Sequence, residues 1–146
     1  MDSDIGLEHD GVSGIGANSP CATPCNLYLR VMMIDPVASN PDHYSVLFEN
    51  ERVRVLKYHD KPGTVTRPHD HPDSVMITAS SFRRELIQGD RRAEVELPAG
   101  RAMWLAAQSH AGHNIGETDT DVFFVELKEP APVAGASGMN PLGPVG

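Results

Sequence analysis

The stretch Gly63-Thr64-Val65-Thr66-Arg67-Pro68-His69-Asp70-His71 carries the most information about fold and chemistry in this sequence. It follows a turn signal, Asp60-Lys61-Pro62-Gly63, and it precedes β-type sequence. Side chains in an extended strand return to the same face every second residue, so His69 and His71 are expected to project together. Two imidazoles on one face can bind one metal ion. The alternative is a pair of surface loop histidines.

Short segments of β-type sequence separated by turn residues surround this stretch. In the segment Arg92 to Leu97, Ala93, Val95 and Leu97 are expected to face inward and the charged residues outward. Other strands are predicted over residues 44–49, 52–59, 74–80, 82–88, 101–107 and 121–128. No segment shows a convincing helical stripe, so the pattern predicts an all-β barrel or sandwich. The last strand is apolar on both faces, which indicates a second layer or a subunit contact.

The two ends of the 146-residue chain differ in composition from its middle. Residues 1–32 have no apolar periodicity and are predicted to form a disordered arm that contains Cys21 and Cys25. Residues 130–146 are rich in Pro, Gly and Ala and are predicted to form a flexible tail. Residues 33–129 are therefore expected to form one β-barrel domain.

Charge and hydropathy limit the classes of function that the sequence allows. The net charge of −8 and a pI near 5.2 argue against a nucleic-acid partner. The pairs Arg83-Arg84 and Arg91-Arg92 are interpreted as outward strand positions and loop residues. No apolar run reaches the length of a membrane span, and no convincing secretory signal is present, so we expect a cytoplasmic protein with a small-molecule partner.

Two spaced motifs resemble those of the cupin superfamily, in particular its small single-domain members. Gly63, His69 and His71 match the Gly-x5-His-x-His of the first cupin motif. The glutamate that follows in the family is missing, since Val75 or Met76 stands at its place.

The second motif is matched in part. Gly100, His110 and Asn114 fit it, whereas its Pro-x-Gly is replaced by Ala106-Ala107-Gln108. The resemblance covers most of residues 47–128 and implies a cupin-type double-stranded β-helix, or jelly-roll barrel. Because small cupins commonly pair, it also favours a homodimer.

The resemblance implies a metal site made by His69, His71 and His110. If the strand alternation continues past Pro72, Val75 faces the metal and cannot act as a ligand. Gln108 shares parity with His110, so it is expected to be a weak fourth ligand or a hydrogen-bond donor next to the ligands. Trp104 is a further candidate for the pocket wall.

Three neutral imidazoles leave the charge of a divalent ion uncompensated and some coordination positions open, as in catalytic metal sites. Related three-histidine cupins include dioxygenases that act on thiols and β-dicarbonyl compounds. We therefore expect an Fe(II)-dependent dioxygenase acting on a small anionic, dicarbonyl or thiol substrate.

Two alternatives stay open. One is a lyase or isomerase that uses Zn(II), Mn(II) or Ni(II) as a Lewis acid. The other is a non-catalytic cupin that binds or senses a ligand. Whether the protein is an enzyme is thus not decided by the sequence. Candidates for handling substrate or protons are Arg67, Asp73 and Tyr58.

Overall fold

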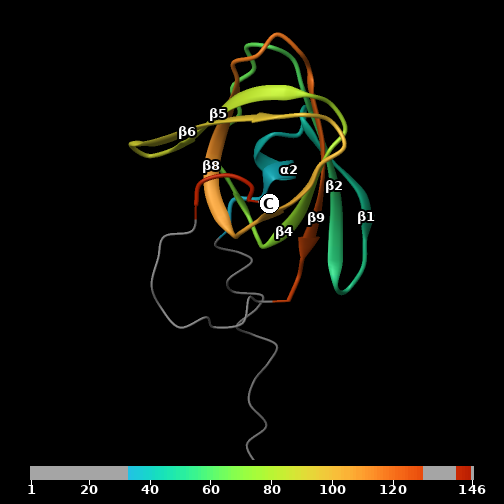
Figure 1. Cartoon of the computed structure of the whole chain (residues 1–146). Helices are drawn as coiled ribbons and strands as arrows, with labels where there is room; N and C mark the ends of the chain where they lie inside the picture. The colour runs from blue at the N-terminus through green and yellow to red at the C-terminus, as the bar shows by residue number, and fades with distance from the viewer. Residues whose placement is uncertain (1–32, 130–140, 146) are drawn as a thin grey trace, which may run out of the picture.

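Two antiparallel sheets make up the protein in the computed structural model, which describes residues 33–129 and 141–145 (Figure 1). The five-stranded sheet has the order β1 (Tyr44–Glu49), β2 (Val53–Asp60), β9 (Thr120–Leu127), β4 (Ser74–Thr78) and β7 (Ala102–Leu105). The four-stranded sheet has the order β3 (His69–His71), β8 (Gln108–Asn114), β5 (Phe82–Gln88) and β6 (Arg91–Leu97). The short helix α2 (Pro36–Ser39) precedes them. All seven strands predicted from the sequence are present.

Strand alternation fills the space between the sheets with apolar side chains. On β6 the predicted pattern is confirmed, since Ala93, Val95 and Leu97 are half-buried and the residues between them are exposed. The buried core contains Tyr44, Leu56, Tyr58, Met76, Phe82, Leu105, Val122 and Phe124. Each large apolar side chain buried in this way stabilises the fold by roughly 1.5–3 kcal/mol. The core therefore supplies a rigid frame around the inner ends of the histidines.

The alternation of side chains breaks between β3 and β4. His69 and His71 are buried on β3, but the buried residues of β4 are Ser74, Met76 and Thr78. The expectation that Val75 faces the histidines is therefore wrong, and Met76 occupies the inner position. Proline cannot donate a ladder hydrogen bond, so the strand stops at Pro72 and resumes in the other phase.

A row of apolar side chains crosses the outer face of the five-stranded sheet. Its members are successive register partners: Phe48, Val55, Val125, Val75 and Trp104. Trp104 is 39% exposed, so its predicted place in the pocket wall is wrong. Phe48, at the other end of the row, is 53% exposed. The homodimer expected from the sequence stays a prediction, and this face is where a second copy would bury apolar surface.

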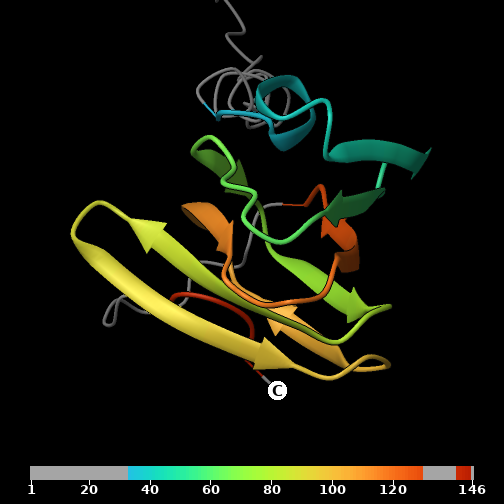
Figure 2. The same cartoon turned by 90° about the horizontal axis from the view of Figure 1, so that it is seen from above.

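Residues 141–145 return to the barrel and lie against β7 and β8 (red in Figure 2). Trp104 and Val145 exchange two backbone hydrogen bonds of 2.9 and 2.8 Å. The backbone N–H of Gly143 donates to Gln108 Oε1 at 3.0 Å. This part of the chain is thus tied down, although its composition predicted a flexible tail. Residues 1–32, with both cysteines, and residues 130–140 and 146 lie outside the described part of the chain.

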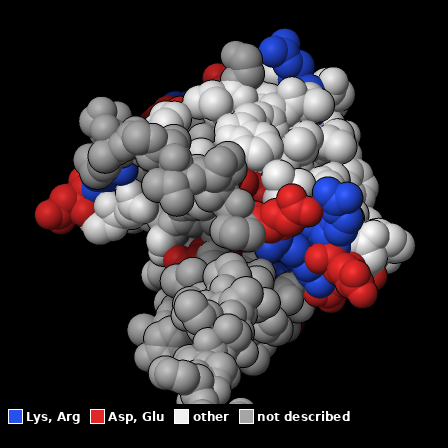
Figure 3. Space-filling view, turned by 90° about the horizontal axis from the view of Figure 1, so that it is seen from below, with Lys and Arg blue, Asp and Glu red and all other residues white. Residues whose placement is uncertain are grey.

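Charged side chains on the surface pair with one another. Examples are the ion pairs Arg52–Glu129 at 3.0 Å and Lys128–Glu49 at 2.6 Å. On the face shown in Figure 3, basic and acidic side chains lie next to each other. Within the described residues, no helix is long and apolar enough to cross a membrane.

Candidate metal centre

Three buried histidines from two neighbouring strands converge inside the barrel. His69 and His71 lie on β3, and His110 on β8 is the register partner of His69. One ring nitrogen of each histidine lies within 4.8 Å of the others. The ring centroids are 4.9 Å apart for His69 and His71, 5.1 Å for His69 and His110, and 5.3 Å for His71 and His110. The strand pairing therefore brings together the three residues that the motif spacing singled out.

Each histidine is oriented by a hydrogen bond from its Nδ1 atom to an oxygen acceptor. His69 Nδ1 donates to the carbonyl of Arg67 at 2.7 Å, and His71 Nδ1 donates to Glu126 Oε1 at 3.1 Å. His110 Nδ1 donates to Gln108 Oε1 at 3.1 Å. Because carbonyl and carboxylate oxygens only accept hydrogen bonds, each ring carries its hydrogen on Nδ1. Each Nε2 is thus left with a lone pair, the form in which imidazole binds a metal.

The orientation of Gln108 is itself determined by its neighbours. Its amide nitrogen donates to the Ala106 carbonyl at 3.0 Å, and its Oε1 accepts from the backbone of Gly143 at 3.0 Å. These two contacts identify Oε1 as the amide oxygen, which accepts from His110 Nδ1. Gln108 is thus a hydrogen-bond partner of His110, but as an acceptor rather than the donor expected from the sequence.

Behind His71 lies a chain of buried and half-buried charges that the sequence did not reveal. Glu126 Oε2 accepts from Arg54 at 2.9 Å, and Arg54 also pairs with Asp35 at 3.0 Å. Glu126 is almost fully buried, and a buried carboxylate is costly unless a cation compensates it. Arg54 supplies that charge next to the carboxylate that holds the His71 ring.

Burial favours the neutral form of two of the three histidines, His69 and His110. Desolvation and the neighbouring His71 lower the pKa of His69 to about 4. Desolvation, followed by the neighbouring His71 and His69, lowers the pKa of His110 well below its ordinary value. Neutral imidazoles whose lone pairs converge on one point suit a cation better than any neutral group. The residues present therefore fit a divalent metal ion.

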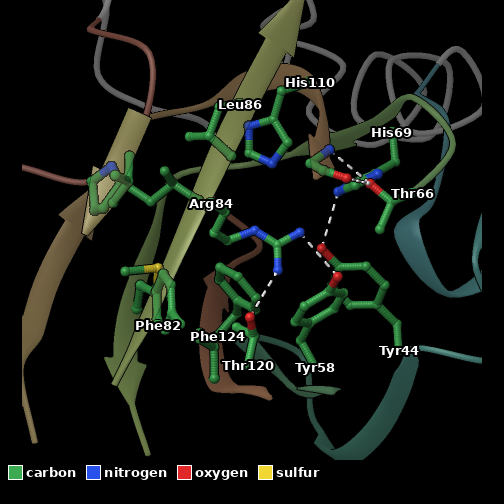
Figure 4. Close-up of a pocket in the computed structure, with 16 residues that line it drawn as sticks. Tyr44, Tyr58, Thr66, His69, Phe82, Arg84, Leu86, His110, Thr120 and Phe124 are labelled. Atoms are coloured by element: carbon green, nitrogen blue, oxygen red, sulfur yellow. Dashed lines mark hydrogen bonds between the residues drawn. The ribbon is translucent and has the colours of Figure 1, made fainter. Parts of the chain in front are cut away.

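Tyr44 was not identified from the sequence, yet its hydroxyl lies in the middle of this cluster. The Tyr44 oxygen is 3.0 Å from His69 Nε2, a contact drawn in Figure 4. It is also 3.4 Å from His71 Nε2. Its ring is buried and packs against Tyr58 at a centroid distance of 4.6 Å. Burial raises the pKa of the Tyr44 hydroxyl well above its usual value, so it carries its proton in the metal-free protein.

A cavity of about 40 Å³ adjoins the histidines. In Figure 4, His69 and His110 line its upper part, and Arg84, Tyr58 and Thr120 line its lower part. A water molecule needs roughly 10–15 Å³ of such space, so the cavity suits a few waters or a very small molecule. Most of the other lining side chains are apolar: Met76, Phe82, Leu86, Val95, Leu105, Val122 and Phe124.

Arg84 is buried inside the barrel, so its interpretation as an outward strand residue is wrong. Its guanidinium pairs with Asp60 at 2.8 Å and donates to the Tyr58 hydroxyl at 3.0 Å. Tyr58 in turn donates to Asp60, which also accepts from Asn114 at 3.0 Å. Gly112 has no Cβ atom, and the Arg84 guanidinium occupies the space that a Cβ atom at this position would need. The result is a positively charged side chain, largely compensated by Asp60, at the cavity wall.

The three candidates for handling substrate or protons lie in different places. Tyr58 lines the cavity, as expected of a site residue. The Arg67 side chain is exposed, and the contribution of this residue is its backbone carbonyl, which orients His69. Asp73 accepts from the backbone N–H of Ala107 at 2.8 Å and holds that loop. Neither Arg67 nor Asp73 lines the cavity, so the structure corrects both expectations.

Comparison with known proteins supports the fold. No family model and no curated protein matches the sequence. A cupin domain from Bordetella pertussis Tohama I has a TM-score of 0.55 and 24% sequence identity, over 59% of this chain and 92% of that domain. At this identity the likeness shows the fold and no more. The double-stranded β-helix of the cupins is thus the architecture that holds the three histidines.

Two further solved structures are similar with lower TM-scores. A protein with a double-stranded β-helix domain from Klebsiella pneumoniae subsp. pneumoniae MGH 78578 is 25% identical, with a TM-score of 0.46, over 60% of this chain and 77% of that chain. HppE, crystallised with cobalt(II) and its substrate, is 11% identical, with a TM-score of 0.46, over 58% of this chain and 52% of that chain. Because both TM-scores are below 0.5, nothing about this chain follows from them.

Proposed function

We propose that this protein, a single-domain chain with the cupin fold, is a metal-dependent enzyme. In this proposal His69, His71 and His110 hold one divalent ion, with Fe(II) favoured, and the reaction is dioxygenation of a small anionic, dicarbonyl or thiol substrate. The observation that supports it is the convergence of three buried imidazoles, each with its Nε2 lone pair directed inward and its Nδ1 held by an acceptor.

The protein side chains have defined tasks in this proposal. His69, His71 and His110 bind the ion, while the Arg67 carbonyl, Glu126 and Gln108 fix their tautomers and orientations. An Fe(II) ion in such a site would supply the redox chemistry towards O₂ and a position for an anionic substrate. The mostly apolar lining would lower the local dielectric around the ion, which would strengthen its attraction for an anion.

The cavity wall favours an oxygenase over a lyase or isomerase. Lewis-acid chemistry on a carbonyl compound usually needs a positioned base that removes a proton. Among the described residues that line the cavity there is no carboxylate, and the nearby Asp60 is already occupied by Tyr58, Arg84 and Asn114. Burial raises the pKa of Tyr58, which makes it a poor source of an anionic base. An oxygenase depends less on such a group.

The test is O₂ consumption by protein purified without oxygen and loaded with Fe(II). A panel of small β-dicarbonyl compounds and thiol carboxylic acids should include a substrate that consumes O₂ in proportion to product. The His110→Ala variant should be inactive on the same panel. Turnover of a panel member with Zn(II) and without O₂ would instead support the lyase or isomerase. A metal-free protein that nevertheless binds panel members would support a non-catalytic cupin.

A further inference from the structure

We propose that Tyr44 is a fourth ligand of the metal ion, as a phenolate. This inference rests on the proposed metal site and adds to it a protein oxygen that the motifs do not contain. Tyr44 is the first residue of β1, 25 residues before His69 in the sequence. The strand therefore brings the phenol to the histidines from outside the stretch that carries the cupin motifs.

The distances around the Tyr44 oxygen are those between ligands of one ion. Two donor atoms each about 2.1 Å from a metal, at angles between those of octahedral and tetrahedral geometry, lie about 3.0–3.4 Å apart. The Tyr44 oxygen lies 3.0 Å from His69 Nε2 and 3.4 Å from His71 Nε2. It therefore stands, relative to these two nitrogens, at the separation that a shared ion requires.

The hydrogen bonds in the cluster leave a place for a cation. His69 and His71 both carry their ring hydrogen on Nδ1, so both Nε2 atoms only accept. The Tyr44 hydroxyl has one hydrogen and can serve only one of these two lone pairs at a time. A metal ion would satisfy both nitrogens and the phenol oxygen together, with loss of the phenol proton to solvent.

The first cupin motif contains a glutamate that this sequence lacks. A Tyr44 phenolate would supply a negative charge in its place. Met76, an uncharged residue, takes the inner position of β4 near that place. One phenolate would reduce the net charge of a three-histidine site with a divalent ion from two to one, which lowers the cost of burying the ion. Four ligands in an octahedral site would still leave room for a substrate and O₂.

The Tyr44 side chain is held in place by its surroundings. It is 5% exposed, its ring packs against Tyr58 and Phe124, and its backbone N–H donates to the Asn40 carbonyl at 3.0 Å. A side chain fixed in this way loses little further entropy when it binds an ion. The hydroxyl is thus pre-positioned rather than recruited.

The test compares Tyr44→Phe with Tyr58→Phe, which removes a hydroxyl from the neighbouring buried ring but leaves the histidine cluster intact. Circular dichroism and thermal melting identify a variant that fails to fold, and Tyr44→Leu then serves as a second probe. Wild type loaded with Fe(III) should show a visible phenolate-to-metal charge-transfer band that Tyr58→Phe retains and Tyr44→Phe loses. Competition with a chelator should show Zn(II) binding weakened about tenfold or more in Tyr44→Phe alone.

Two results would overturn the inference, and they differ in what they say of the proposed function. A wild-type protein that binds Zn(II) in a His110-dependent manner, but shows neither the band nor a loss of affinity in Tyr44→Phe, would leave the three-histidine site and remove Tyr44 from it. A wild-type protein that binds neither Zn(II) nor Fe(III) would overturn the metal site and the ligand role of Tyr44 together.

Discussion

His71 Nδ1 donates a hydrogen bond of 3.1 Å to the carboxylate of Glu126, a residue 55 positions further along the chain. Both side chains are almost completely buried. Glu126 comes from β9 and His71 from β3, so the contact joins the five-stranded sheet to the four-stranded sheet. The carboxylate therefore ties the proposed metal ligand to the frame of the barrel.

The Glu126→Gln variant should bind metal more weakly while keeping its fold. The amide can still accept from His71, but it lacks the negative charge that makes the ring a stronger ligand, and losses of this kind are about 10- to 100-fold in affinity. Chelator competition with Zn(II) measures the change. Glu94→Gln is the matched control, because Glu94 forms an exposed ion pair with Arg83 on the outside of β6. Equal affinities for the two variants would show that Glu126 does not tune the site.

Gly112→Ala should displace the buried Arg84. A Cβ atom at position 112 would lie 2.4 Å from Arg84 Nη2, closer than any real contact. The guanidinium would have to leave Asp60 and the Tyr58 hydroxyl, or the strands would have to separate, at a cost of about 1–3 kcal/mol. Urea unfolding of wild type and variant gives the difference in the free energy of unfolding. An unchanged free energy of unfolding would mean that Arg84 has another place to go.

Acid should destabilise the metal-free protein in a defined pH window. The pKa of His69 is about 4 in the folded protein against about 6.5 for an unperturbed histidine, so between these values the unfolded chain binds more protons. The free energy of unfolding should then fall as the pH decreases from about 6.5 towards 4, by up to about 1.4 kcal/mol per pH unit for each such histidine. Urea titrations at several pH values measure this slope. His69→Gln should flatten it, and an equally steep slope in that variant would contradict the assignment.

Removal of residues 141–146 should make the metal more accessible. Pro144 lines the cavity, and Gly143 shares with His110 the Oε1 atom of Gln108. Without this segment, Gln108 loses one of the contacts that orient it, and the cavity opens. We expect EDTA to remove Zn(II) several-fold faster from the truncated protein than from a protein lacking Gly146 alone. Equal rates would show that the segment does not limit access.

The strand pattern and the three histidines could be predicted from the sequence because both depend on local features. Alternation and turn residues define the strands, and the His69-Asp70-His71 spacing places two rings on one face of β3 whatever lies around them. The match of His110 to the second motif supplied the third ring. Gln108 followed from its parity with His110 on β8.

The remaining site residues depend on contacts between strands that are distant in the chain. Glu126 and Tyr44 meet the histidines only through the order of the sheets, which no local pattern contains. Arg84 looked like a surface residue because its buried partner, Asp60, lies in another strand. The error at Val75 has a local cause, the change in strand alternation at Pro72. A proline at this place signals that the alternation can shift, but it does not say in which direction the next side chains point.

The metal content of the protein, purified without added metal or chelator, tests the central claim most directly. Elemental analysis should find close to one divalent transition-metal ion per chain in wild type and a large loss in a folded His110→Ala variant. A wild-type protein without bound metal that also fails to take up Fe(II) or Zn(II), or a His110→Ala variant with an unchanged content, would contradict the account.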